Sequence, residues 1–162
     1  MKLSTRGRYA VTAMADLATH CSGRPVTLAE IADRQAISLS YLEQLFGKLR
    51  RFGLVQSSRG PGGGYTLGRT PAETPIADIV LAVDEPIRAT GCKPGSARAC
   101  NGASARCLTH DLWEELGNQI QLYLSSVTLA DVIARRVPSA EGAPVAPAVA
   151  DNLAESQASL SA

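Results

Sequence analysis

The chain has 162 residues, of which 45% are apolar and 19% charged, a size that suits one domain or one small domain with appendages. No apolar run approaches the roughly 18–20 residues of a membrane span, and the first residues lack the apolar core of a signal peptide, so we expect a cytoplasmic protein without a membrane partner. The formal net charge is +1, but residues 1–70 carry ten basic and four acidic side chains, whereas residues 71–162 carry six and eleven. The basic first half predicts a domain that binds a polyanion.

Three helices are predicted at the start of the chain. Apolar residues recur at helical spacing over residues 5–22, and the run Thr27-Leu28-Ala29-Glu30 is a capping box that begins a second helix ending near Arg34. A tight connection follows, and either Ser38 or Ser40 caps the third helix, the latter as part of a second capping box. Two helices joined by such a short turn are typical of a helix-turn-helix unit.

A hairpin follows the third helix. Gly53 is the candidate C-cap of that helix. Short strands at residues 54–57 and 65–67 flank a turn at residues 59–64 that is rich in Gly and Pro. The order helix, helix, turn, helix, hairpin predicts a winged helix-turn-helix domain over residues 1–70, in a protein that is mainly α with a small β-wing.

The third helix is predicted to read the major groove of double-stranded DNA. Its Leu and Phe side chains gather on one side, and small or hydrogen-bonding side chains lie opposite, followed by basic ones. Gln pairs with adenine, Ser with several bases and Glu with the amino group of cytosine; the alternative is an ordinary solvated face. The wing turn and the start of the first helix add phosphate contacts. The candidate DNA-binding residues are Arg6, Arg8, Tyr9, Ser38, Ser40, Tyr41, Glu43, Gln44, Lys48, Arg51, Arg59 and Gly60.

The second half begins with Thr74-Pro75, which opens a linking helix within residues 71–86. Residues 87–110 are predicted to form a ligand-bearing loop, because most of them lack periodicity. A dimerisation helix is predicted over residues 109–136, and the Ala-, Pro- and Ser-rich residues 137–162 are expected to be a disordered tail. An apolar seam with alternating spacings of three and four residues runs along the dimerisation helix and comprises Trp113, Leu116, Ile120, Tyr123 and Val127.

Four candidate metal ligands lie in the loop and at the start of the long helix: Cys92, Cys100, Cys107 and His110. Three thiolates and an imidazole can hold zinc or an iron–sulfur cluster. Structural zinc sites usually contain a closely spaced Cys pair, which this loop lacks, whereas a cluster accepts wider spacing. An RNA-binding zinc finger is disfavoured because no aromatic residue lies between the ligands. Unligated thiols are a further alternative, and we interpret Cys21 as a core residue.

The runs at residues 3–11, 37–46, 59–65 and 107–113 closely resemble the bacterial Rrf-type winged-helix transcription factors that depend on an iron–sulfur cluster. The resemblance implies a homodimer on a palindromic operator, with one 2Fe–2S cluster per subunit held by the three loop cysteines and His110. It implies that the iron–sulfur cluster assembly machinery donates the cluster, and that the protein represses the genes for that machinery, including its own operon. The cluster-free form can then bind other promoters.

No arrangement of residues resembles a catalytic dyad, so we expect a regulator rather than an enzyme. A winged-helix regulator of the same family that senses nitric oxide, zinc or thiol oxidation is the alternative to a sensor of cluster status.

Overall fold

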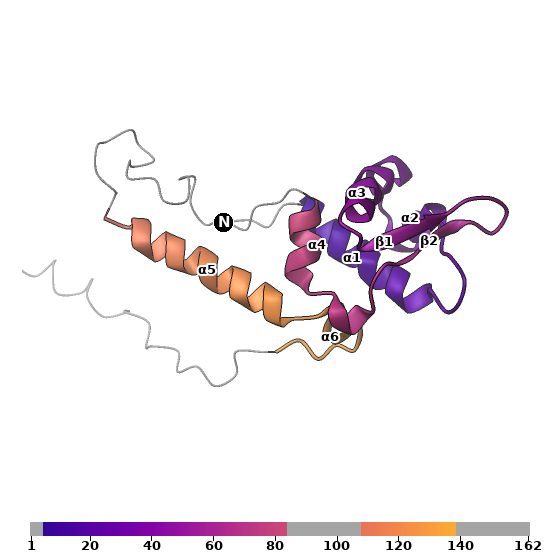
Figure 1. Cartoon of the computed structure of the whole chain (residues 1–162). Coiled ribbons are helices and arrows are strands. Elements are labelled where there is room, and N and C mark those ends of the chain that lie inside the picture. The colour runs from indigo at the N-terminus through magenta and orange to yellow at the C-terminus, as the bar shows by residue number, and fades with distance from the viewer. Residues whose placement is uncertain (1–4, 84–107, 139–162) are drawn as a thin grey trace, which may run out of the picture.

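The computed structural model describes residues 5–83 and 108–138, and Figure 1 shows their arrangement. The described part is mainly helical with one two-stranded antiparallel sheet, which confirms the predicted fold class. The predictions for Cys92, Cys100 and Cys107 and for the tail beyond residue 138 lie outside the described residues. The elements in chain order are α1 (Thr5–His20), α2 (Leu28–Gln35), α3 (Leu39–Arg51), β1 (Val55–Ser58), β2 (Gly64–Leu67), the 3-10 helix η1 (Pro71–Glu73), α4 (Ile76–Ala82), α5 (His110–Ser126) and α6 (Leu129–Ile133).

Helix α1 lies at the centre of the fold, in contact with α2, α3, α4, α6 and β2. Its buried face presents Ala10, Ala13, Met14 and Leu17 at helical spacing. The two alanines allow neighbouring helices to approach closely, and the larger side chains fill the space between them. Around α1 lies a single cluster of buried apolar side chains that includes Ile31, Leu42, Phe46, Leu49, Ile79, Val80 and Leu129.

The helix-turn-helix unit consists of α2, a tight turn and α3. The predicted capping box of α2 is present: the Thr27 side chain accepts a hydrogen bond from the Glu30 N–H, and the Glu30 carboxylate accepts one from the Thr27 N–H. Ala36 ends α2 in the left-handed region, at φ +53°. The predicted capping by Ser40 is wrong, because Ser38 occupies the N-cap position and its carbonyl already accepts bonds from the third helix, so that Ser40 lies inside the first turn.

The C-terminus of α3 directs the chain into the wing. Phe52 is the C-cap, and Gly53 follows in the left-handed region at φ +71°. The N–H of Leu54 donates to the carbonyl of Leu49 and the N–H of Gly53 to that of Arg50, both at 3.0 Å. These two bonds form a Schellman motif in which Gly53 follows the C-cap, so the residue predicted as the C-cap lies one position beyond it.

The wing is anchored to the helical body as well as to itself. β1 pairs with β2 in antiparallel register, from Val55 opposite Leu67 to Ser58 opposite Gly64. Tyr65 also pairs with Val26, in the loop before α2, through two backbone bonds of 2.7 and 2.9 Å. The bridge between the wing and the α1–α2 loop holds the wing beside the helix-turn-helix unit.

Three predicted boundaries of helices are corrected. The first helix ends at His20 rather than residue 22, and the linking segment contains η1 and the short helix α4. The predicted dimerisation helix over residues 109–136 is two helices, α5 and α6. A capping box starts α6 anew, because the Thr128 side chain accepts from the Asp131 N–H while the Asp131 carboxylate accepts from the Thr128 N–H.

Val127, which was predicted to lie in the dimer seam, is instead part of the monomer core. It is extended rather than helical and is 2% exposed. Its carbonyl accepts a hydrogen bond of 2.9 Å from the N–H of Ile76, and the N–H of Leu129 donates to the carbonyl of Thr74. These bonds attach the end of α5 and the start of α6 to the segment that begins α4.

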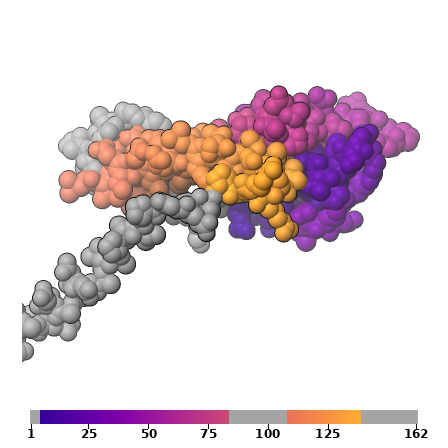
Figure 2. Space-filling model, turned by 90° about the horizontal axis from the view of Figure 1, so that it is seen from below, coloured from indigo at the N-terminus to yellow at the C-terminus, as the bar shows by residue number. Residues whose placement is uncertain are grey.

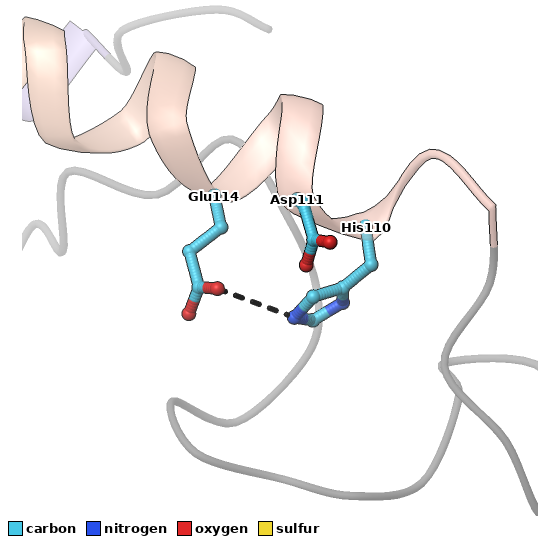
Figure 3. A group of neighbouring side chains, drawn as sticks. All are labelled: His110, Asp111 and Glu114. Carbon is cyan, nitrogen blue, oxygen red and sulfur yellow. Dashed lines mark ion pairs between the residues drawn. The ribbon is translucent and has the colours of Figure 1, made fainter.

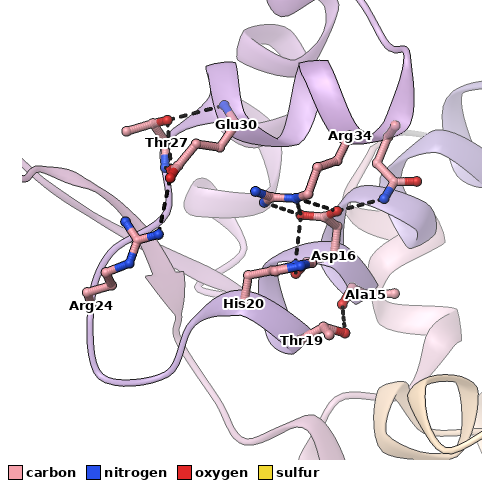
Figure 4. Close-up of polar contacts among 9 residues, drawn as sticks. Ala15, Asp16, Thr19, His20, Arg24, Thr27, Glu30 and Arg34 are labelled. Atoms are coloured by element: carbon pink, nitrogen blue, oxygen red, sulfur yellow. Dashed lines mark hydrogen bonds and ion pairs between the residues drawn. The ribbon is translucent and has the colours of Figure 1, made fainter.

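A buried carboxylate joins α1 to the end of α2 (Figure 4). The side chain of Asp16 is fully buried and accepts two bonds from Arg34 to Oδ1, at 2.6 and 3.1 Å, and one of 2.6 Å from the Gln35 amide to Oδ2. The His20 Nδ1–H donates to the Asp16 carbonyl at 2.8 Å. Burial raises the pKa of Asp16, but the bonds from Arg34 and Gln35 more than offset it, so the pKa lies below its ordinary value.

The Asp16→Asn variant is expected to lower the free energy of unfolding by about 3 kcal/mol, because it leaves the Arg34 charge without its anionic partner in a partly buried site. Equilibrium urea denaturation measures this difference. The matched control is Asp33→Asn, which neutralises an exposed carboxyl on the same helix pair and should change stability by less than about 0.5 kcal/mol. Equal losses in the two variants would contradict a structural role for the network.

The capping box of α2 predicts a specific dependence of stability on pH. The backbone and side-chain hydrogen bonds from Thr27 lower the pKa of Glu30 from 4.5 to about 2. Because the folded pKa is depressed, the stabilisation is fully present above pH 4.5 and is lost as the pH falls through about 2. The gap in unfolding free energy between the native protein and Glu30→Gln should therefore shrink across this window. A gap that stays constant from pH 5 to 2 would show that the carboxylate form carries no advantage.

Candidate DNA-binding surface and metal-binding residues

The exposed face of α3 carries the side chains predicted to read DNA. Ser38, Ser40, Glu43, Gln44 and Arg51 are exposed, while Lys48 is half-buried. The opposite face of the same helix packs into the core through Leu42, Leu45, Phe46 and Leu49. The two faces therefore separate as the residue pattern predicted, and a row of polar side chains is left accessible to a partner.

Aromatic pairs hold α3 against its neighbours. The rings of Tyr9 and Tyr41 meet edge to face with centroids 6.0 Å apart, and those of Phe46 and Tyr65 do so at 4.9 Å. Tyr9 and Tyr41 were predicted as DNA contacts, and the structure places them as partners that connect the start of α1 to α3. Tyr65 connects α3 to the wing.

The remaining predicted contacts lie on α1 and at the tip of the wing. Arg6 and Arg8 are exposed in the first turns of α1, and Arg59 and Gly60 are exposed between β1 and β2. Gly60 has φ +97°, a backbone conformation that residues other than glycine rarely adopt. The Arg50 guanidinium donates to the Ser57 hydroxyl at 3.3 Å, which links α3 to β1. Arg50 is one of the basic residues predicted at the end of this helix, but its contact with Ser57 depends on the folded chain.

His110, the only predicted metal ligand within the described residues, is the first residue of α5 (Figure 3). Its side chain is buried, and its Nδ1 atom has no hydrogen-bond partner among the residues that the structure describes. Its Nε2 atom lies 3.6 Å from a carboxylate oxygen of Glu114, one helical turn further along. Potential ligand atoms of His110, Asp111 and Glu114 all lie within 4.8 Å of one another.

The environment of His110 suits a metal ligand. A buried imidazole nitrogen without a partner is destabilising, and native proteins rarely leave such an atom unsatisfied unless a ligand completes the site. Imidazole nitrogen is a common metal donor. Cys107 precedes His110 by three residues, so a thiolate donor is adjacent in the chain.

Helix α5 extends from the winged-helix body (Figure 2), and several of its large apolar side chains are exposed. Of its 17 residues only His110 and Gly117 are buried. Trp113, Leu116 and Tyr123 of the predicted seam are exposed, and Ile120 is half-buried. The structure adds two strongly exposed leucines that the seam omitted, Leu112 and Leu122.

Comparison with known proteins identifies the family. Residues 3–135 match the model of the Rrf2 family, described as iron-dependent transcriptional regulators. The chain belongs to the Rrf2 family. Its relatives include the HTH-type transcriptional regulator ORF2 of Azotobacter vinelandii, which is 54% identical over 83% of this chain and 80% of its own length. The HTH-type transcriptional regulator IscR of Photorhabdus laumondii is 52% identical over 82% of this chain and 79% of its own length.

Solved structures of Rrf2 relatives share the fold. IscR of T. potens is 38% identical with a TM-score of 0.67, over 83% of this chain and 88% of its own length. CymR, the global cysteine regulator of B. subtilis, is 33% identical with a TM-score of 0.69, over 83% of this chain and 98% of its own length. The predictions of an IscR-like, DNA-binding transcriptional regulator and of a protein that is not an enzyme are thereby confirmed. Within residues 5–83 and 108–138, no helix has both the length and the apolar character that crossing a bilayer requires.

Two variants separate base reading from phosphate binding. Gln44→Ala is expected to change the preference at one base-pair position by about 1–3 kcal/mol, and Arg59→Ala to weaken binding to all sequences and reduce the salt slope by about one. Anisotropy titrations on a duplex selected from a random library, at several salt concentrations, measure both effects. The control is Gln119→Ala on α5, which should leave DNA affinity unchanged. An identical pattern for Gln44→Ala and Arg59→Ala would refute the division of roles.

Proposed function

We propose that the chain is a homodimeric regulator of transcription whose choice of DNA sites depends on a 2Fe–2S cluster, one per subunit, held by Cys92, Cys100, Cys107 and His110. The buried and unpartnered Nδ1 of His110 carries this proposal, because a metal would satisfy an atom that the described residues leave without a bond. The similarity to relatives named IscR supports the same assignment.

The proposed regulator represses the genes for iron–sulfur cluster assembly, including its own operon, and receives its cluster from that assembly machinery. The cluster-free form binds other promoters. Bound at this site, the cluster would be a redox-active group whose presence depends on how much cluster the cell supplies. The protein contributes one histidine at the start of α5, and the remaining donors are the thiolates of Cys92, Cys100 and Cys107, which precede it in the sequence.

The proposed dimer forms through the exposed apolar face of α5. An amphipathic helix with only two buried residues leaves apolar area that a second copy can cover. Leu112, Trp113, Leu116 and Tyr123 provide that area, and Val127 is excluded from it by its place in the core. Two-fold symmetry of the dimer matches a palindromic operator, since each subunit presents one recognition helix.

A continuous path of contacts connects the proposed cluster ligand to the DNA-binding surface. His110 begins α5, and the other end of α5 leads into Val127, whose carbonyl accepts a bond from Ile76 at the start of α4. α4 packs against α1 and α5, and α1 against α3. We propose that ligation of His110 fixes the start of α5 and thereby the relative placement of the two recognition helices in the dimer.

The decisive experiment is purification of the full chain without oxygen, followed by a visible absorption spectrum and iron, sulfide and zinc assays. The proposal predicts a red-brown protein with about two irons and two sulfides per chain. His110→Ala should lose the cluster, whereas His20→Ala, the change at the only other histidine, should retain it.

A colourless protein that carries zinc, or no metal, would contradict the cluster proposal and favour a zinc- or thiol-sensing regulator. The similarity to CymR, which is named a global cysteine regulator, supports the thiol-sensing alternative in particular. A cluster that reacts with nitric oxide and does not control the assembly genes would favour the nitric-oxide alternative.

A further inference from the structure

We propose that Glu114 is a positioning residue for His110: its carboxylate holds the Nε2–H of the imidazole, so that Nδ1 is the atom that ligates the metal. This inference rests on the proposed function, because it assumes that His110 is a cluster ligand. It assigns the ligating atom and adds a residue that the candidate set did not contain.

The two nitrogens of His110 lie in different environments (Figure 3). Nδ1 is buried and has no hydrogen-bond partner within residues 5–83 and 108–138. Nε2 lies 3.6 Å from Oε2 of Glu114. A neutral imidazole has one N–H and one lone pair. The proton is most stable on the nitrogen that faces the carboxylate, which leaves the lone pair on the buried Nδ1.

Helix geometry supports the pairing. Residues four apart lie on the same face of an α-helix, one turn above the other. His110 and Glu114 have this spacing at the start of α5, so the contact requires no other element. The Glu114 side chain is 40% exposed, and its 3.6 Å separation from Nε2 is that of an ion pair rather than of a hydrogen bond. A small rotation would shorten 3.6 Å to a hydrogen bond, as often happens when a site receives its ligand.

The proposed contact affects both the retention and the electronic properties of the metal. Histidine ligands commonly donate their second ring N–H to a carboxylate, which orients the ring and makes the ligating nitrogen more basic. A more basic donor stabilises the oxidised state of the bound iron and lowers its reduction potential. Loss of the Glu114 charge should therefore raise the potential and loosen the cluster.

Isotope labelling identifies the ligating atom directly. In a His20→Gln background, His110 is the only histidine, so labelling His with 15N at either Nδ1 or Nε2 marks a single atom. Pulsed electron paramagnetic resonance of the reduced cluster should detect strong 15N coupling for the Nδ1 label. Strong coupling for the Nε2 label would overturn this inference and leave the proposed function intact. Absence of strong coupling for both labels would overturn the assignment of His110 as a ligand, and the inference with it.

Three charge-neutralising variants test the role of Glu114. Glu114→Gln should raise the midpoint potential and accelerate loss of the cluster to a chelator by about tenfold. Asp111→Asn removes the same charge from the same turn of α5 without the four-residue spacing, and Glu115→Gln removes it from the next residue. Both should have smaller effects. Equal shifts in all three variants would show that only net charge matters and would overturn the inference.

Discussion

A fully buried carboxylate sets the geometry on which DNA recognition depends. Asp16 lies on α1, the helix that contacts most of the fold, and it is bonded to Arg34 and Gln35 at the end of α2. The turn that begins at Ala36 then leads directly into α3. Because a buried charge needs all its partners, the network permits one placement of α2 against α1. The exposed face of α3 is positioned through that placement, together with the aromatic contacts and the core.

A second constraint joins the two halves of the chain. The carbonyl of Val127 and the N–H of Ile76 form a bond between the end of α5 and the start of α4, and Leu129 with Thr74 form another beside it. These backbone bonds resemble a short strand pairing, so α5 leaves the body in a defined direction with its apolar face uncovered. The proposed ligand His110 lies at the opposite end of α5 from this attachment. A change in its ligation would therefore act on the direction of the whole helix.

Local patterns in the sequence predicted many features correctly. The capping box at Thr27, the glycine after α3 and the wing hairpin each involve residues that interact within a few positions of one another. The seam prediction failed at Val127 because apolar spacing continued past the point where a new capping box interrupts the helix. Spacing alone does not distinguish a residue that faces a partner subunit from one that packs in the core of its own chain.

The sequence by itself determined the winged-helix class, the family resemblance, the polar face of α3 and the set of residues predicted to ligate a cluster, with His110 at the start of a helix. These features follow from residue type and from contacts between near neighbours. Tertiary structure alone decided the network of Asp16 with Arg34, the place of Val127 in the core and the unpartnered state of Nδ1 in His110. Each depends on which distant segments approach in space and on which atoms are thereby removed from water, and a linear pattern does not contain that information.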